Sequence, residues 1–357
     1  MNPFNIISDT GVSAAVYAGL SRAKCTGQYK ECRNGGSTFL RNVKFHITDP
    51  RNRNLTLNGR KSNIFQMVAE TFWVMSGSGN IKEFLEFFLP RAPQYSDDGI
   101  NWHGAYGPRM YAHNQLQSAI DLLIKDKDTR RAYVMIADPT LDSAPAIEAA
   151  YGVGHSPKDV PCNREIHINI IEDKLCMKVI QRSGDMLFGT GSINPFEFTF
   201  LQELLSEATG YALGDYQWDV TDAHYYKAFE DQVNDVLRSE QTFWPNDGKP
   251  LGTRFTSATK MQEFFAGVVR VWVKQINRLI DLGDAHYAIN DLFADYGVLP
   301  EGRLRDYAKM VTFYIAAKQG EIEGDFKALL TNIPTNTDLG QAILTSPFRK
   351  FGVVLGD

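Results

Sequence analysis

Residues 160–185, VPCNREIHINIIEDKLCMKVIQRSGD, place a cysteine and an arginine–serine pair at the two ends of a predicted strand pair. The first strand alternates apolar and polar residues and the second is largely apolar, as expected for strands with one or both faces buried. Residues 195–215 follow with the pattern of a long buried helix that ends at a glycine. The chain must therefore build a sheet that carries a thiol and a cation at the ends of paired strands.

The overall charge excludes a generally basic, nucleic-acid-binding surface. The 357 residues carry a formal net charge of -5 with a pI of about 5.9, so phosphate recognition requires a local cluster of arginines. The four cysteines form no CxxC pair, and no metal site is expected. The N-terminus lacks the pattern of a secretory signal, and no apolar run approaches the length of a membrane span. These features predict a soluble protein in a reducing, cytoplasmic setting, where a thiol stays reduced.

The predicted secondary structure changes near residue 240. Before it, residues 37–47 alternate like a strand, and residues 62–77 have helical spacing after a serine cap at Ser62. Residues 91–109 are predicted as a long surface loop, and residues 138–161 as a loop that can contain a short helix over residues 146–152. After it, helical patterns dominate. We therefore expect a catalytic domain over residues 1–240 and a mainly helical extension over residues 241–357.

Cys162 is the candidate nucleophile. A single cysteine most often behaves as a small buried hydrophobic residue. Cys162, however, opens a strand directly after Pro161, and arginines lie further along the chain. Positive neighbours favour the nucleophilic thiolate. Cys25, Cys32 and Cys176 lack this setting and are expected to be structural.

The arginines near the strand pair are candidate phosphate ligands. Arg182 and Ser183 combine a bidentate cation with a hydroxyl, which suits phosphate oxygens, although a surface salt bridge is the simpler interpretation of an arginine alone. Arg130 and Arg131 also fit basic residues at the end of a helix. No single signal decides between these interpretations.

The order of the motifs carries a family resemblance. Residues 32–232 contain, in this order, CRNGGST, AETFW, AYGPR, TRR, VPC, QRSGD followed by FG, an IN before a long helix, and DAHYY. This series resembles the thymidylate synthase family, which includes the phage pyrimidine hydroxymethylases. The resemblance implies an α+β fold, a three-layer sandwich with a large mixed sheet, and an obligate homodimer with shared active sites.

The resemblance also implies a role for each matching residue. Cys162 would attack C6 of a pyrimidine nucleotide, Tyr106 would assist at C5, and Glu70 would organise water and proton transfers. Asp185 would face the pterin of 5,10-methylenetetrahydrofolate, which is the implied co-substrate, and Glu70 would lie in the same cleft. The nucleotide would be held by Arg33, Gln181, Arg182, Ser183, Asn194, His224 and Tyr226, and by Arg130 and Arg131 acting on the partner subunit's phosphate. Glu70 also fits a solvated helix face, but its apolar neighbours favour a site.

Asn194 bears on the identity of the base. An amide can donate to O4 and accept from N3–H of uracil, whereas an aspartate here would suit cytosine. Asn194 aligns with the family position if one residue is inserted in FGTGSIN, and it also fits a helix cap before Pro195. The resemblance therefore favours dUMP over dCMP or CMP, and deoxyribose and ribose both remain open.

The product is expected to be 5-hydroxymethyl-dUMP. Synthases carry a histidine after the catalytic cysteine, tryptophans near the positions of Ala92 and Tyr95, and a short closing tail, whereas this chain has Asn163 and a long extension. A displaced lid would admit water, and a hydroxymethyl product would serve DNA modification in the cytoplasm, the host cytoplasm if the protein is viral. Thymidylate synthesis, action on dCMP or CMP, and a non-catalytic nucleotide-binding paralog are the alternatives. The joint presence of Cys162, Glu70 and Asp185 argues against the paralog.

Overall fold

The computed structural model describes residues 5–32, 35–296, 302–322 and 333–346. Within these residues, eight strands form one mixed sheet in the order β1–β3–β8–β6–β5–β4, with β2 paired to β3 and β7 paired to β8. The strands are β1 (Asn5–Asp9), β2 (Gln28–Lys30), β3 (Ser37–Ile47), β4 (Tyr133–Met135), β5 (Asn163–Ile171), β6 (Lys174–Gln181), β7 (Gly184–Asp185) and β8 (Ala212–Tyr226). The predicted α+β sandwich with a large mixed sheet is confirmed.

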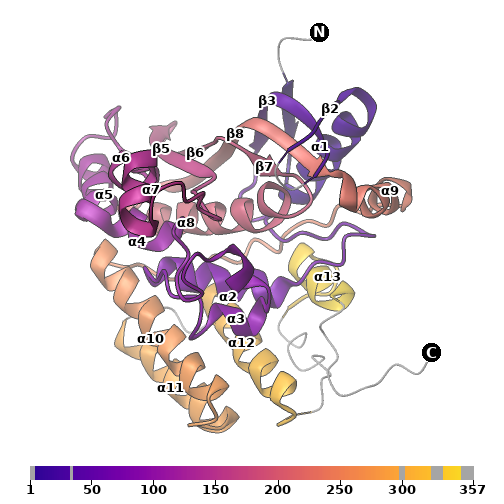
Figure 1. Ribbon diagram of the computed structural model, residues 1–357. Coiled ribbons are helices and arrows are strands. Elements are labelled where there is room, and N and C mark those ends of the chain that lie inside the picture. The colour runs from indigo at the N-terminus through magenta and orange to yellow at the C-terminus, as the bar shows by residue number, and fades with distance from the viewer. Residues whose placement is uncertain (1–4, 33–34, 297–301, 323–332, 347–357) are drawn as a thin grey trace.

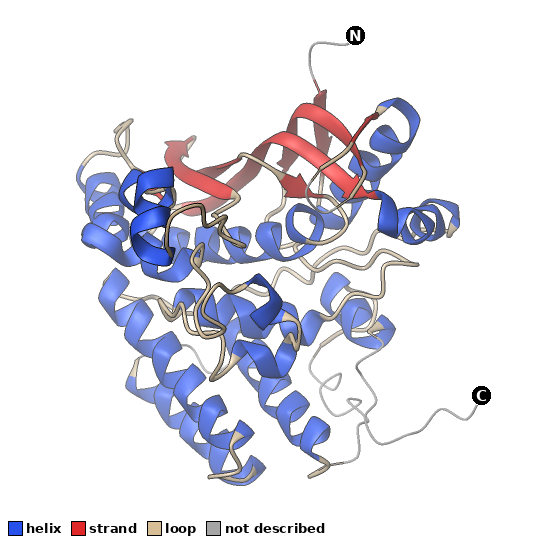
Figure 2. Ribbon diagram, in the orientation of Figure 1, coloured by secondary structure: helices blue, strands red, loops and turns tan. Residues whose placement is uncertain are grey.

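Helices cover one face of the sheet in successive layers (Figures 1 and 2). Helix α1 (Val12–Thr26) packs on β1 and β3, and α8 (Asn194–Thr209) packs on β6 and β8. Helix α2 (Ile64–Met75) lies against α8 on the side away from the sheet. Every residue of α8 from Asn194 to Ser206 is buried, so each polar side chain in this stretch needs a partner or faces a cavity.

The predicted helix over residues 62–77 agrees with α2, whereas the predicted helix over residues 195–215 is too long at its C-terminal end, because residues from Ala212 onward form β8. Helix α8 ends at Gly210, whose φ of 82° lies in the left-handed region that favours glycine. Helix α2 is capped by Asn63, whose side chain accepts a hydrogen bond from Gln66 N at 3.2 Å, and not by Ser62. Both residue types cap helices well, so the sequence alone did not separate them.

The predicted surface loops at residues 91–109 and 138–161 are more ordered than expected. They contain η1 (Ala92–Tyr95), α4 (Tyr106–Tyr111), α6 (Pro139–Asp142) and α7 (Ala144–Tyr151). The buried guanidinium of Arg109 donates to both carboxylate oxygens of Asp142, at 2.9 and 2.8 Å, and to the His103 carbonyl oxygen at 2.9 Å. The prediction of a surface loop over residues 91–109 holds for residues 96–105, but Arg109 near its end is buried and its ion pair with Asp142 ties both segments together.

The extension is helical, as predicted, and shares its core with the rest of the chain. It contains α10 (Ala258–Ile276), α11 (Leu282–Asp295), α12 (Arg303–Gln319) and α13 (Asp338–Thr345), preceded by α9 (Glu230–Arg238). The ring of Phe72 in α2 lies 5.0 Å from Phe265 and 5.1 Å from Trp272 of α10, between ring centroids. The division of the chain near residue 240 remains a prediction. Within the described ranges, no helix combines the length and apolar character needed to cross a bilayer.

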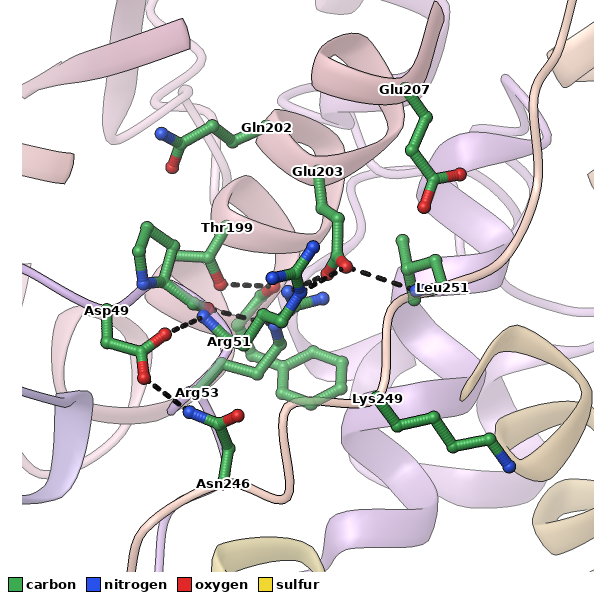
Figure 3. A network of polar contacts seen from close by, with 12 residues as sticks. Asp49, Arg51, Arg53, Thr199, Gln202, Glu203, Glu207, Asn246, Lys249 and Leu251 are labelled. Carbon is green, nitrogen blue, oxygen red and sulfur yellow. Dashed lines mark hydrogen bonds and ion pairs between the residues drawn. The ribbon is translucent and has the colours of Figure 1, made fainter. Parts of the chain in front are cut away.

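Carboxylates on α8 hold the extended segment that leads into α10 (Figure 3). Glu203 forms ion pairs with Arg51, at 2.7 Å, and with Arg53, and it accepts from Leu251 N at 3.1 Å. One turn later, Glu207 accepts from Thr253 N at 2.8 Å. Burial pushes the pKa of Glu203 upward, but Arg53 and Arg51 more than offset it, and the pKa lies below its usual value.

Removing the Glu203 carboxylate is expected to destabilise the protein strongly. Glu203→Ala leaves the Arg53 guanidinium buried without its counter-ion, which costs about 3–5 kcal/mol of unfolding free energy. This corresponds to a fall of roughly 5 °C in Tm by differential scanning calorimetry. The control is Lys127→Ala, which removes the exposed Lys127–Asp173 pair, leaves Asp173 with its φ of 57° unchanged, and is expected to leave Tm nearly unchanged. Equal Tm values for the two variants would contradict this account.

Candidate active site

Eight of the residues singled out in the sequence line one cavity of about 270 Å³. Helix α2 contributes Glu70, α4 contributes Tyr106, and Cys162 lies directly before β5. The other five are Ser183, Asp185, Asn194, His224 and Tyr226. These eight side chains thus combine a thiol, two carboxyl groups, an amide, an imidazole, two phenols and a hydroxyl group, a set suited to proton transfer beside a nucleophile.

Strand pairing brings these segments together. In the β5–β6 pair Asn163 lies opposite Gln181, and Arg182 N donates to the Cys162 carbonyl oxygen at 2.9 Å. In the β7–β8 pair Asp185 lies opposite His224. The thiol-bearing residue and the QRSGD segment are therefore neighbours because the two strands pair in antiparallel register.

Two predicted nucleotide ligands lie beside the cavity and not in it. Gln181 is fully buried, and its amide hydrogen-bonds Asn163 and Thr190, so it supports residues at the cavity wall. Arg182 lines a second cavity of about 600 Å³, and its guanidinium donates to Val160 O at 2.7 Å and to Pro161 O at 3.1 Å. Tyr226 lines both cavities, which places the second one next to the first.

The remaining predicted arginines are not brought to the site of their own chain. Arg130 and Arg131 are exposed, between α5 (Gln115–Lys125) and β4, and they line neither of these cavities. Arg33 lies outside the described residues.

Burial controls the charge of the two predicted carboxyl groups. It raises the pKa of Glu70 to about 7, against weaker opposing effects of a hydrogen bond from Gln66 and the charge of Arg91. Burial also raises the pKa of Asp185, although His224 and backbone hydrogen bonds from Leu187 and Phe188 oppose it. A carboxyl group that titrates near neutral pH is suited to accept and return a proton.

The phenol of Tyr106 stays protonated. Burial raises its pKa well above the usual value, and the charge of Cys162 adds to this effect. Tyr106 is therefore a hydrogen-bond donor next to the thiol.

His224 is held in place by its own strand. Its Nδ1 lies 3.0 Å from a carboxylate oxygen of Asp222, which also pairs with Lys30. The Tyr226 ring meets the His224 ring edge-on, with 4.9 Å between centroids. The two side chains thus present adjacent polar groups to the cavity.

Among the residues of the cavity wall that sequence reasoning missed are two indoles and two carboxyl groups, those of Trp73, Trp102, Asp159 and Glu197. The two indoles meet edge-on at 5.7 Å, and Trp102 Nε1 donates to Ala92 O at 3.0 Å. Trp102 thus supplies an indole in the segment where the family resemblance places tryptophans, near Ala92. Glu197 carried a usable signal, since it is a carboxylate inside the apolar run PFEFTF.

Comparison with known proteins agrees with this geometry. The thymidylate synthase family model matches residues 19–247. A protein of Pseudomonas phage M6 named deoxyuridylate hydroxymethyltransferase is 30% identical over 236 residues, which cover 65% of this chain and 63% of the phage protein. A protein of the same name from Bacillus phage SP01 is 29% identical over 201 residues, covering 52% of this chain and 50% of that protein. The chain thus spans between half and two thirds of the length of these relatives.

The family match covers more than half of the chain, and it contains every residue that lines the cavity of about 270 Å³. The chain belongs to the thymidylate synthase family.

Proposed function

We propose that this protein transfers a one-carbon unit from 5,10-methylenetetrahydrofolate to C5 of dUMP and releases 5-hydroxymethyl-dUMP. The observation that carries the proposal is the convergence of Cys162, Glu70, Tyr106 and Asn194 on one cavity. Two phage relatives named deoxyuridylate hydroxymethyltransferase support the substrate and the product.

The nucleotide would span the two adjoining cavities. Arg182 and Ser183 would hold the 5′-phosphate. They are consecutive residues, and Ser183 lines the first cavity while Arg182 lines the second. His224 and Tyr226 would bind the 3′-hydroxyl group. Asn194 would read the uracil edge by donating to O4 and accepting from N3–H. Gln181 would act indirectly, by fixing Asn163 and Thr190 behind the base.

Cys162 would open the reaction as a thiolate. Its sulfur forms a bond to C6, and the electron pair of the C5–C6 double bond moves onto C5 and O4, so that C5 becomes a carbon nucleophile. After C5 has gained its new carbon substituent, Glu70 would take up the C5 proton, directly or through a water molecule. Tyr106, as a neutral donor beside Cys162, would hold that water near C5.

The other wall of the cavity fits a folate. The indoles of Trp73 and Trp102 offer flat apolar surfaces for a pterin ring, and the Asp185 carboxyl group can accept from its N–H groups. The folate supplies a one-carbon unit at the oxidation level of formaldehyde. Asp185 and Glu70 would orient it against C5.

The choice of product depends on what attacks the exocyclic methylene group at C5. Water gives the hydroxymethyl nucleotide, and the C6–sulfur bond of Cys162 then breaks to restore the C5–C6 double bond. Hydride transfer would instead give dTMP and dihydrofolate, the reaction named in the family description. Asn163, which stands where synthases carry histidine, and the phage relatives favour water.

The working unit is proposed to be a homodimer with shared sites. The exposed positions of Arg130 and Arg131, away from the cavity of their own chain, suit residues that reach the phosphate bound by a partner subunit. Burial of the open sheet face between two subunits would provide the large interface typical of obligate dimers.

Product analysis tests the proposal. After incubation with methylenetetrahydrofolate and each of dUMP, dCMP, UMP and CMP, mass spectrometry is expected to find a hydroxymethyl group on dUMP alone, with no rise in dihydrofolate absorbance. A methyl product with an equal amount of dihydrofolate would establish a thymidylate synthase instead. No modified nucleotide in any reaction would contradict the enzyme assignment and favour a nucleotide-binding paralog.

A further inference from the structure

Glu197 is a carboxyl group in the cavity that has no role in the proposed reaction. It lies in the first turn of α8, is 2% exposed, and lines the cavity together with Glu70 and Asn194. Its Oε2 atom is fully buried without a hydrogen-bond partner in the described structure. A buried, unpartnered carboxyl oxygen at a cavity wall indicates a missing ligand atom.

Glu197 has reason to be neutral. It shares the cavity with Glu70 from the facing helix α2, and none of the ion pairs found in the described ranges includes either glutamate. Two carboxylates that face one apolar cavity cannot both be charged without a large cost. The charge of Glu197 also affects the pKa of the phenols of Tyr106 on α4 and Tyr216 on β8. The same cavity is lined by the titratable groups of Asp159, Cys162, Asp185, His224 and Tyr226, of which only His224 can carry a positive charge.

The direction of the pKa shift supports this geometry. Burial raises the pKa of Glu197 well above its usual value, and the charge of Glu70 raises it further. A hydrogen bond from Asn194 and the positive end of the α8 dipole oppose the rise without cancelling it. The neutral form of Glu197 is thus favoured, and a carboxylic acid has one O–H donor and one carbonyl acceptor.

The Asn194 amide alone does not distinguish uracil from cytosine. A side-chain amide can rotate by 180° and exchange its donor and acceptor, so that it pairs with O4 and N3–H of uracil or with N4–H and N3 of cytosine. The amide needs a neighbour that fixes its orientation. Glu197 lies one helical turn away and accepts a hydrogen bond from the Asn194 side chain.

We propose that Glu197 determines base specificity, by orienting the Asn194 amide and by donating its carboxyl proton toward the 4-position of the pyrimidine. The inference rests on the proposed function and deepens it. The carbonyl oxygen of Glu197 accepts one Nδ2–H of Asn194, which leaves the other Nδ2–H for O4 and the Oδ1 atom for N3–H. The Glu197 hydroxyl group adds a second donor to O4. A 4-amino group, itself a donor, is rejected because it faces two donors and no acceptor.

Binding constants for dUMP and dCMP, measured by isothermal titration calorimetry without folate, test the inference. Glu197→Met keeps the volume but removes the donor and the acceptor, and it is expected to lower the preference for dUMP over dCMP about tenfold. Glu197→Gln keeps a neutral donor and an acceptor and is expected to retain the preference within about threefold. An unchanged preference in Glu197→Met, or an equal loss of affinity for both nucleotides, would overturn the inference.

A pH series separates this role from a structural one and decides the question if Glu197→Met does not fold. As pH rises, ionisation of Glu197 should weaken the preference for dUMP in the wild type more than in Glu197→Gln. The glutamine variant cannot ionise at this position, so it corrects for titration of uracil N3. Parallel curves for the two proteins would contradict the inference. The product analysis on the wild type is independent of these results, so failure of the proposed function would be recognised separately.

Discussion

Replacement of Cys162 by alanine is expected to lower kcat by about 10⁴-fold or more, while Kd for dUMP changes less than about threefold. The thiolate forms the bond to C6 on which every later step depends, so without the thiol C5 is not activated as a carbon nucleophile. The phosphate, ribose and base contacts come from other side chains around the cavity. Initial rates of product formation and calorimetric binding of dUMP measure the two quantities.

Cys25→Ala is the matched control for this variant. Cys25 is an exposed thiol on α1, outside the residues that line the cavity. Its replacement is expected to leave kcat within about twofold of the wild type. Residual turnover above about 1% in Cys162→Ala would contradict a nucleophilic role, and loss of dUMP binding would mean that the thiol contributes to recognition.

Replacement of Glu70 by glutamine is expected to lower kcat by about 10²–10⁴-fold, the usual contribution of general acid–base catalysis. With a pKa of about 7, the base is protonated below neutral pH and ionised above it. The wild-type kcat should therefore rise as pH increases through about 7, and this rise should be absent in Glu70→Gln. A pH–rate profile from pH 5.5 to 8.5 at saturating dUMP measures both effects.

The unfolding free energy of Glu70→Gln shows whether a loss of activity comes from catalysis or from unfolding. The pKa of Glu70 is raised from 4.5 in the unfolded chain to about 7 in the folded protein, so the folded state binds more protons between these values. Stability from Glu70 is present below pH 4.5 and is lost as pH rises through 7, by an amount on the order of 3 kcal/mol. Glu70→Gln should thus be at least as stable as the wild type at pH 8.

Glu83→Gln, at an exposed position, serves as the control for both readouts, with unchanged kcat and Tm expected. A Glu70→Gln variant that keeps its activity, or one that loses activity and unfolds at pH 8, would contradict the assigned role.

The sequence predicted the part of the site that depends on local motifs. Cys162 and Asp185 lie next to short motifs on paired strands, and antiparallel pairing of β5 with β6 brings those motifs together. Glu70 was assigned from the family resemblance, and its apolar neighbours Val68, Phe72 and Trp73 favoured a site over a solvated helix face. The actual side-chain directions could not be predicted. Gln181 and Arg182 are consecutive in a motif, yet one points into the core and the other into a second cavity.

Contacts between residues that lie far apart in the sequence could not be predicted from it. Trp102 reaches the cavity because its loop is tied to distant residues by the Arg109–Asp142 ion pair. The sequence predicted a long buried helix over residues 195–215 but not the partners of its carboxylates: the segment that leads into α10 lies across α8 and uses Glu203 and Glu207 as hydrogen-bond acceptors. Periodicity predicts which residues are buried, but it does not predict what covers them.

Trapping a covalent complex tests the central claim most directly. A fluorine atom at C5 of dUMP cannot leave as a proton, so the complex formed after C5 has gained its carbon substituent should accumulate on the enzyme. Mass spectrometry of the protein after incubation with 5-fluoro-dUMP and methylenetetrahydrofolate is expected to show a mass gain equal to both molecules, located on the peptide that contains Cys162. No mass gain, or a gain located on Cys25, Cys32 or Cys176, would contradict the proposal that Cys162 activates the pyrimidine.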